Sequence, residues 1–85
     1  MSALEKIWAK IKDRPYRSDI TMNELHSFML NVGFVLASQS SSHRKYKHEQ
    51  AGCDIVIPCH DPRREVLPVY VKKVYELVVD NNLLG

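Results

Sequence analysis

The chain has 85 residues, of which 45% are hydrophobic and 26% are charged, and its formal net charge is +2 at pH 7. A chain of this length forms one domain that buries only about two thirds of its unfolded surface, and the ordinary balance of apolar and charged residues excludes wholesale disorder. No apolar run approaches the roughly 20 residues that span a bilayer, which favours a cytoplasmic protein.

The first predicted element is an amphipathic helix over residues 2–13, where large apolar side chains recur at helical spacing: Leu4, Ile7, Trp8 and Ile11. Trp8 is expected to dock this helix on the rest of the domain. Pro15 ends the helix, since proline disfavours helical backbone at the residue before it.

A second helix begins after Thr21. The spacing of Thr21 and Glu24 predicts a capping box, in which each side chain accepts a hydrogen bond from the backbone amide of the other residue. The buried face of this helix is predicted to consist of Leu25, Phe28, Met29 and Val32. Gly33 is expected to end it, because glycine readily adopts the left-handed backbone conformation.

Three short strands are predicted next, and the turns between them indicate an antiparallel meander: residues 34–37, 43–48 and 53–58. Side chains alternate between the two faces of a strand. One face of the middle strand therefore carries His43, Lys45 and Lys47. The other face carries Arg44, Tyr46 and His48.

The last predicted helix starts at Pro68, and its apolar residues again recur at helical spacing: Val71, Val74, Tyr75 and Val78. The order α-α-β-β-β-α predicts a single α+β domain over residues 1–85, with helices packed on one face of a three-stranded antiparallel sheet. The opposite face of the sheet is left for solvent or a ligand.

His43 is the first candidate for chemistry, because imidazole takes and gives a proton near neutral pH. Basic residues suited to phosphate contact follow it along the strand: Arg44, Lys45 and Lys47. Before it, Ser41 and Ser42 offer hydroxyls and backbone amides in a turn where an anion can bind. The combination predicts phosphodiester cleavage in RNA, with His43 activating the ribose 2′-hydroxyl or a water.

No cofactor is expected for this reaction. The sequence has no pair of carboxylates placed as a metal nuclease needs them, and its histidines and cysteines match none of the usual zinc spacings. Cys53 and Cys59 lie in one extended segment, which holds their α-carbons roughly 20 Å apart, beyond disulfide reach. His60 is expected to be a hydrogen-bonded structural residue, and as the sequence neighbour of Cys59 it points away from that thiol rather than activating it.

The chain resembles the HicA-type toxins, the mRNA interferases of bacterial type II toxin–antitoxin systems, from about Thr21 to Leu84. The resemblance rests on four segments in the right order. These are the helix ending in Gly33-Phe34, the segment Ser41-Ser42-His43-Arg44-Lys45-Tyr46, the strand ending in Ile57-Pro58-Cys59-His60, and a closing helix after a charged loop. Residues 1–17 are similar to the N-terminal helical extension of some relatives, which leaves residues 18–85 as the core.

This resemblance implies a fold like the double-stranded-RNA-binding domain and an endoribonuclease that cleaves mRNA without the ribosome. It also implies a cognate HicB-type antitoxin that covers the active site. The family's essential histidine corresponds to His43. His60 corresponds to the family's second histidine, to which we assign a supporting role together with Tyr46.

The chain departs from the family pattern beside His43. Ser40 and Ser41 stand where the family usually has a glycine, and residues 37–39 replace a stretch that usually holds an arginine. A serine forced to a positive φ would strain or reshape the turn. Two alternatives therefore stay open: a catalytically weakened or inactive RNA-binding module, and a protein-interaction domain whose basic hairpin docks an acidic partner.

Overall fold

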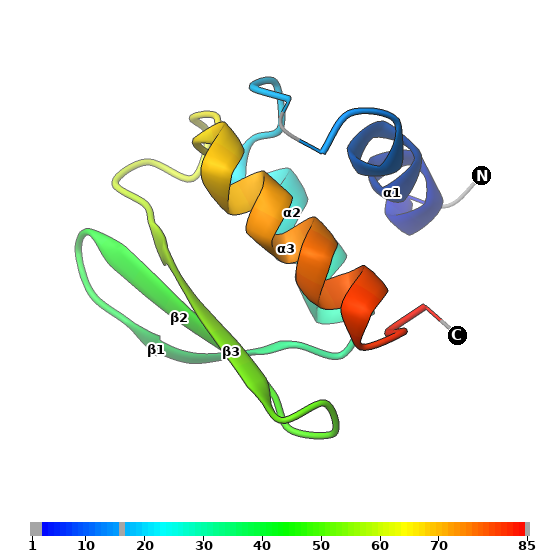
Figure 1. Cartoon of the computed structure of the whole chain (residues 1–85). Coiled ribbons are helices and arrows are strands. Elements are labelled where there is room, and N and C mark those ends of the chain that lie inside the picture. Colours follow the sequence, from blue (N-terminus) through cyan, green and yellow to red (C-terminus); the bar gives the residue numbers. More distant parts are fainter. Residues whose placement is uncertain (1–2, 16, 85) are drawn as a thin grey trace.

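A three-stranded antiparallel sheet lies against helices on one of its faces (Figure 1). The structure, a computed structural model, describes residues 3–15 and 17–84. In chain order its elements are α1 (Ala3–Asp13), α2 (Met22–Asn31), β1 (Val35–Gln39), β2 (His43–His48), β3 (Cys53–Pro58) and α3 (Pro68–Asp80). This order confirms the predicted α+β class; residue 2, the predicted start of the first helix, lies outside the described residues.

The sheet has the order β1-β2-β3, and both neighbouring pairs are antiparallel. The prediction that the first strand ends at residue 37 was wrong, because β1 continues to Gln39. A register shift between Leu36 and Ser38 inserts one extra residue, after which Ser38 pairs with Lys45 and Gln39 with Arg44. Because of this bulge, a polar segment whose sequence predicts a turn still pairs with β2 in the sheet.

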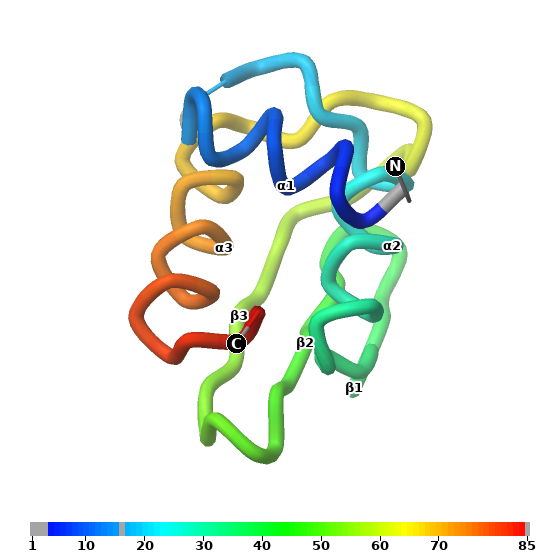
Figure 2. The backbone as a smooth tube through the Cα atoms, turned by 90° about the vertical axis from the view of Figure 1, so that its right-hand side faces the viewer, coloured from blue at the N-terminus to red at the C-terminus, as the bar shows by residue number. Residues whose placement is uncertain are grey.

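The helices form two layers over the inner face of the sheet. The tube view shows α2 and α3 next to the strands, with α1 lying across them (Figure 2). Packing contacts join α1 to both other helices, α2 to β1, and α3 to β3. Side chains from all of these elements share one core, of which the largest fully buried members are Tyr46, Phe28, Phe34, Ile11 and Ile20. None of the helices in the described part of the chain lies over the outer face of the sheet (Figure 1).

The start of α2 is held both by its cap and by the loop that follows β3. The predicted capping box is present: the Glu24 amide donates to Thr21 Oγ1 at 3.2 Å, and the Thr21 amide donates to Glu24 Oε1 at 3.0 Å. The next two amides, of Met22 and Asn23, donate to backbone carbonyls at residues 64 and 62, both at 2.9 Å. Amides at a helix start have no partner within the helix, so these bonds attach residues 61–66 to α2.

Gly33 ends α2 with φ +107°, as the predicted stop requires. Its α-carbon lies directly against the imidazole of His48, which is buried. His48 Nδ1 accepts a hydrogen bond from the Ala51 amide at 3.2 Å, so its Nε2 carries the proton and donates to the Val32 carbonyl at 2.9 Å. His48 is therefore a structural residue of the core and adds nothing to the basic outer face.

Trp8 docks α1 as the sequence predicts. Its indole stacks on Phe28 of α2 with 5.8 Å between ring centroids, and on Tyr75 of α3 with 5.7 Å. Stacked aromatic pairs stabilise packing by about 0.5–1.5 kcal/mol each beyond the burial of their area. One side chain of α1 thus joins the other two helices.

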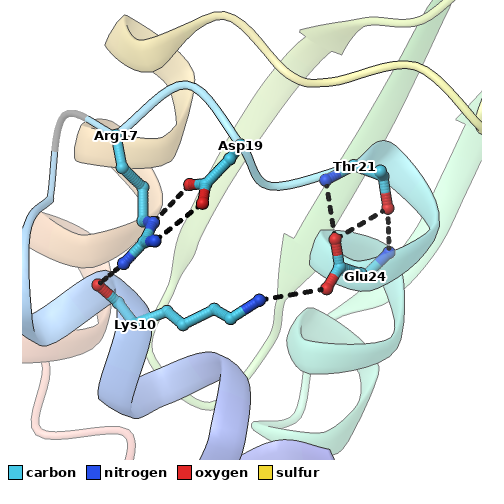
Figure 3. Close-up of polar contacts among 5 residues, drawn as sticks. All are labelled: Lys10, Arg17, Asp19, Thr21 and Glu24. Carbon is cyan, nitrogen blue, oxygen red and sulfur yellow. Dashed lines mark hydrogen bonds and ion pairs between the residues drawn. The ribbon is translucent and has the colours of Figure 1, made fainter.

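The segment between α1 and α2 is fixed by a polar chain (Figure 3). Arg17 donates to both carboxylate oxygens of Asp19 and, from Nη1, to the Lys10 carbonyl at 3.0 Å. The hydrogen bonds from Arg17 lower the pKa of the Asp19 carboxyl to about 2. At the other end of this series of polar contacts, Lys10 Nζ lies 3.9 Å from the Glu24 carboxylate of the capping box.

None of the described helices is long and apolar enough to cross a membrane.

Candidate active site

His43 is the first residue of β2, directly opposite Pro58 of β3, and its side chain is exposed. Strand alternation places it on the outer face of the sheet, as predicted, because Tyr46 and His48 of the same strand point into the core. His43 Nδ1 lies 3.0 Å from the hydroxyl of Ser42. Its Nε2 forms no hydrogen bond with any described residue, so this nitrogen faces solvent.

The turn before His43 is closed by serine hydroxyls rather than by a glycine. The Ser40 hydroxyl accepts hydrogen bonds from the amides of Ser42, at 3.4 Å, and of His43, at 3.1 Å. The Ser42 carbonyl accepts the amide of Cys59 at 2.8 Å. Within residues 3–15 and 17–84, Asn82 is the one non-glycine residue with positive φ. The serines at 40 and 41 therefore hold the turn without strained backbone.

Lys45 and Lys47 share the outer face with His43, as predicted. Lys45 Nζ lies 3.8 Å from a carboxylate oxygen of Asp54, and both side chains are about half exposed. Lys47 is exposed and sits directly opposite Asp54 in the ladder. A single carboxylate thus adjoins two lysine residues, and this part of the surface keeps a net positive charge.

Two hollows adjoin His43. One, of about 300 Å³, lies on the outer face and is lined by His43, Lys45, Val56 and residues 38–40. The other is an open groove of about 700 Å³ between the free edge of β3 and α3, and His43 and Pro58 belong to its lining. The imidazole therefore stands where two concave surfaces meet.

Arg44 does not lie with the two lysines. It is half-buried on the helix-facing side of β2, where its Nη1 is 3.5 Å from the hydroxyl of Tyr46. Tyr46 is completely buried, and its hydroxyl is 2.7 Å from His26 Nδ1. A guanidinium only donates hydrogen bonds, so the Tyr46 hydroxyl accepts from Arg44 and gives its own hydrogen to His26. Tyr46, for which the sequence predicted a supporting role, therefore lies inside the core.

His26 is a residue that the sequence reading missed. It lies on the same helical stripe as Met22, Leu25 and Met29, at spacing i, i+3, i+4 and i+7, so α2 directs it toward the sheet. A polar side chain within an apolar stripe needs a hydrogen-bond partner. That spacing was the available signal, and the partner is Tyr46.

Burial, and then the positive charge of Arg44, lower the pKa of His26 below its usual 6.5. The unfolded chain therefore takes up this proton at a higher pH than the folded chain does. The free energy of unfolding should be constant above about pH 6.5 and fall as the pH decreases toward the lowered pKa. His26→Gln, which keeps an acceptor for Tyr46, should remove this part of the decrease, as measured by urea unfolding between about pH 5 and pH 7.5. Parallel pH curves for the two proteins would contradict this assignment.

His60 is exposed and follows β3 at the end of the sheet where His43 lies. It borders a hollow of about 500 Å³ that also includes Cys59, Arg64 and Glu65. No hydrogen bond between the two imidazoles occurs in the described part of the chain. Cys53 and Cys59 are both free, and residues 3–15 and 17–84 contain no group of three histidine, cysteine, aspartate or glutamate side chains that could hold a metal ion.

Most of the chain is similar to a known protein family. A model of the protein family described as the HicA toxin of bacterial toxin–antitoxin systems matches residues 22–78. The chain therefore belongs to the HicA toxin family: it is the toxin of a toxin–antitoxin pair, and its partner is an antitoxin. The match begins at the first residue of α2, so α1 lies outside it. A search of curated proteins and a search of solved structures found no match.

Proposed function

We propose that this toxin is a metal-independent endoribonuclease that cleaves mRNA, with His43 as the general acid or base. One observation carries the proposal: an exposed imidazole is held through Nδ1 by Ser42 while its Nε2 faces solvent beside Lys45. A general base must have one nitrogen oriented by a partner and the other free to meet the substrate proton. The outer-face hollow beside His43 offers space for the phosphodiester.

The proton transfers follow from the tautomer. When Nδ1–H donates to the Ser42 hydroxyl, Nε2 has a lone pair and takes the proton of the ribose 2′-hydroxyl. The 2′-oxygen then bonds to phosphorus, the bond from phosphorus to the 5′-oxygen breaks, and the leaving oxygen takes a proton from the imidazolium or from water. A water activated by His43 in place of the 2′-hydroxyl would give a linear phosphate. General acid–base catalysis of this kind contributes about 10²–10⁴-fold to a rate.

Lys45 and Lys47 supply the positive charge that the pentacoordinate phosphorane needs. Lys45 exchanges the Asp54 carboxylate, 3.8 Å away, for the phosphate. The Ser42 hydroxyl orients the imidazole, and Ser41 of the same turn is assigned to the scissile group. Arg44 is assigned to the Tyr46 hydroxyl rather than to RNA, because it lies on the other side of the strand.

The partner in this proposal is a HicB-type antitoxin that covers His43 and the outer face. The domain division proposed with it has a helical extension over residues 1–17 and a core over residues 18–85. The family match covers residues 22–78, which lie within the proposed core, and it does not reach the extension.

Induced expression without an antitoxin tests the function. We expect the wild-type chain to arrest growth with loss of mRNA, and His43→Ala to accumulate without either effect. If both proteins accumulate while growth continues and total RNA stays intact, the catalytic proposal is wrong.

An RNA-binding module without catalysis is the second candidate. The observation that favours it is that, among the described residues, no carboxylate and no second imidazole forms a hydrogen bond or ion pair with His43. A binding module predicts that Lys45→Ala and Lys47→Ala weaken RNA binding and its salt dependence, with no special effect of His43→Ala.

A further inference from the structure

The groove between β3 and α3 begins at His43, and helix α3 supplies half of its lining residues, whereas strand and turn residues line the hollow on the outer face. The end of β3 lies near the start of α3, and the helix then runs back along the strand (Figure 1). His43 and Pro58, the last residue of β3, belong to the lining of the groove. The side chains that α3 contributes recur along one helical face: Tyr70, Lys73, Glu76, Leu77 and Asp80. With a rise of 1.5 Å per residue, Tyr70 and Asp80 lie about 15 Å apart along the helix.

An aromatic ring and a cation lie together near the His43 end. Tyr70 is half-buried, and Lys73 Nζ lies 5.3 Å from the centroid of its ring. The ammonium group is exposed and is held to the ring by a contact that is weak at solvent-exposed sites. An aromatic face beside a mobile cation is the pair of groups that bind single-stranded nucleic acid, through base stacking and phosphate contact.

The far end of the groove is acidic. Asp54, Glu76 and Asp80 belong to its lining there, and they outnumber Lys73. Carboxylates repel phosphate, so an RNA backbone does not run along the groove from end to end. They accept hydrogen bonds from the exocyclic amino group of a base, as aspartate and glutamate do from cytosine.

We propose that this groove is a nucleobase subsite for single-stranded RNA whose scissile phosphate lies at His43. The base stacks on Tyr70, and Lys73 leaves the ring to pair with a phosphate at the groove mouth. Glu76 lies six residues, or about 9 Å along the helix, beyond Tyr70, so it is the carboxylate nearest to the stacked base. It reads the edge of the base and favours cytosine, adenine or guanine over uracil, which has no exocyclic amino group. This subsite rests on the proposed ribonuclease function, because His43 then marks the bond that is cut.

The lining of the groove suits RNA better than it suits a protein segment. The lining combines one aromatic ring, one lysine and three carboxylates around an open channel, with Val56, Pro58 and Leu77 as its exposed or half-buried apolar residues. Protein interfaces have an apolar centre that is depleted of charge. A flat base with polar edges matches this mixture.

Binding is measured with 2′-O-methyl oligonucleotides, which cannot be cleaved through a 2′-hydroxyl, and with the full wild-type chain. Lys73→Ala should weaken binding several-fold and decrease the slope of log affinity against log salt by about 0.7. Lys72→Ala is the matched control, because it removes the same charge from the adjacent exposed position outside the groove. Tyr70→Ala should weaken binding by about 5- to 100-fold, whereas Tyr70→Phe keeps the ring and the affinity.

Four outcomes decide the inference when cleavage by the wild-type chain is measured alongside. Loss of affinity in the groove variants, with Lys72→Ala unchanged and uridine the weakest base, supports it. Equal binding of uridine and cytidine overturns the base reading by the carboxylates. Unchanged affinity in Lys73→Ala, and in Tyr70→Ala if that variant folds, overturns the subsite and leaves the nuclease standing if wild type still cleaves. Wild-type protein that neither binds nor cleaves RNA overturns both proposals.

Discussion

His43→Ala is expected to decrease the rate of RNA cleavage by about 10²–10⁴-fold, the usual contribution of a general acid or base. RNA affinity should change little, because the lysines that meet the phosphate remain and only an exposed ring is removed. The measurement is single-turnover cleavage of a labelled RNA by purified protein in the presence of a chelator. The chelator matters because the proposed mechanism has no metal ion.

Two further variants separate chemistry from binding in this assay. Ser42→Ala removes the hydroxyl 3.0 Å from Nδ1 and should decrease the rate by less than His43→Ala, since the imidazole itself remains. Lys47→Ala removes a charge from the same face and should act on affinity and its salt dependence. An affinity loss in His43→Ala as large as its rate loss would contradict an acid–base role.

Gly33→Ala is expected to decrease the free energy of unfolding by about 2–5 kcal/mol, a large share of what a small domain has. At φ +107° an alanine is strained, and its Cβ would lie 2.6 Å from His48 Nε2. The imidazole must move, which breaks its hydrogen bond to the Val32 carbonyl and leaves buried polar groups unpaired. Urea denaturation followed by circular dichroism measures the change.

Gly52 provides the matched control. It also has positive φ, +67°, but a Cβ there would meet nothing within 4 Å. Gly52→Ala should therefore cost only the backbone penalty, about 1–2 kcal/mol. Equal destabilisation by the two substitutions would show that contact with His48 contributes nothing, and the explanation given for Gly33 would then be wrong.

Local chemistry explains why much of the fold could be read from the sequence. The Thr21–Glu24 capping box and the stop at Gly33 are fixed within a few residues, and both occur as predicted. Alternation along β2 likewise depends only on the strand itself, so the faces of His43 and Tyr46 were predictable. The pairing of β1 with β2 could not be predicted in this way. The bulge after Leu36 depends on contacts with β2, and because of this bulge β1 extends beyond its predicted end.

The parts of the site that the sequence did not provide come from contacts between distant segments. The bond between His26 and Tyr46 joins residues 20 positions apart, and the sequence of either segment names no partner for the other. The groove along β3 depends on where α3 lies relative to the sheet edge, so Tyr70 and Lys73 had no sequence signal as neighbours of His43. Arg44 was grouped with the lysines by charge, although alternation already placed it on the opposite face.

The bonds that hold the turn before His43 also set when that turn can form during synthesis. Its Ser42 carbonyl takes the amide of Cys59, and the first amides of α2 take carbonyls from residues 62 and 64. A growing chain that has not yet released these residues from the ribosome lacks the closure of the turn and the loop that holds α2. The environment of His43 therefore forms only when most of the chain has emerged from the ribosome.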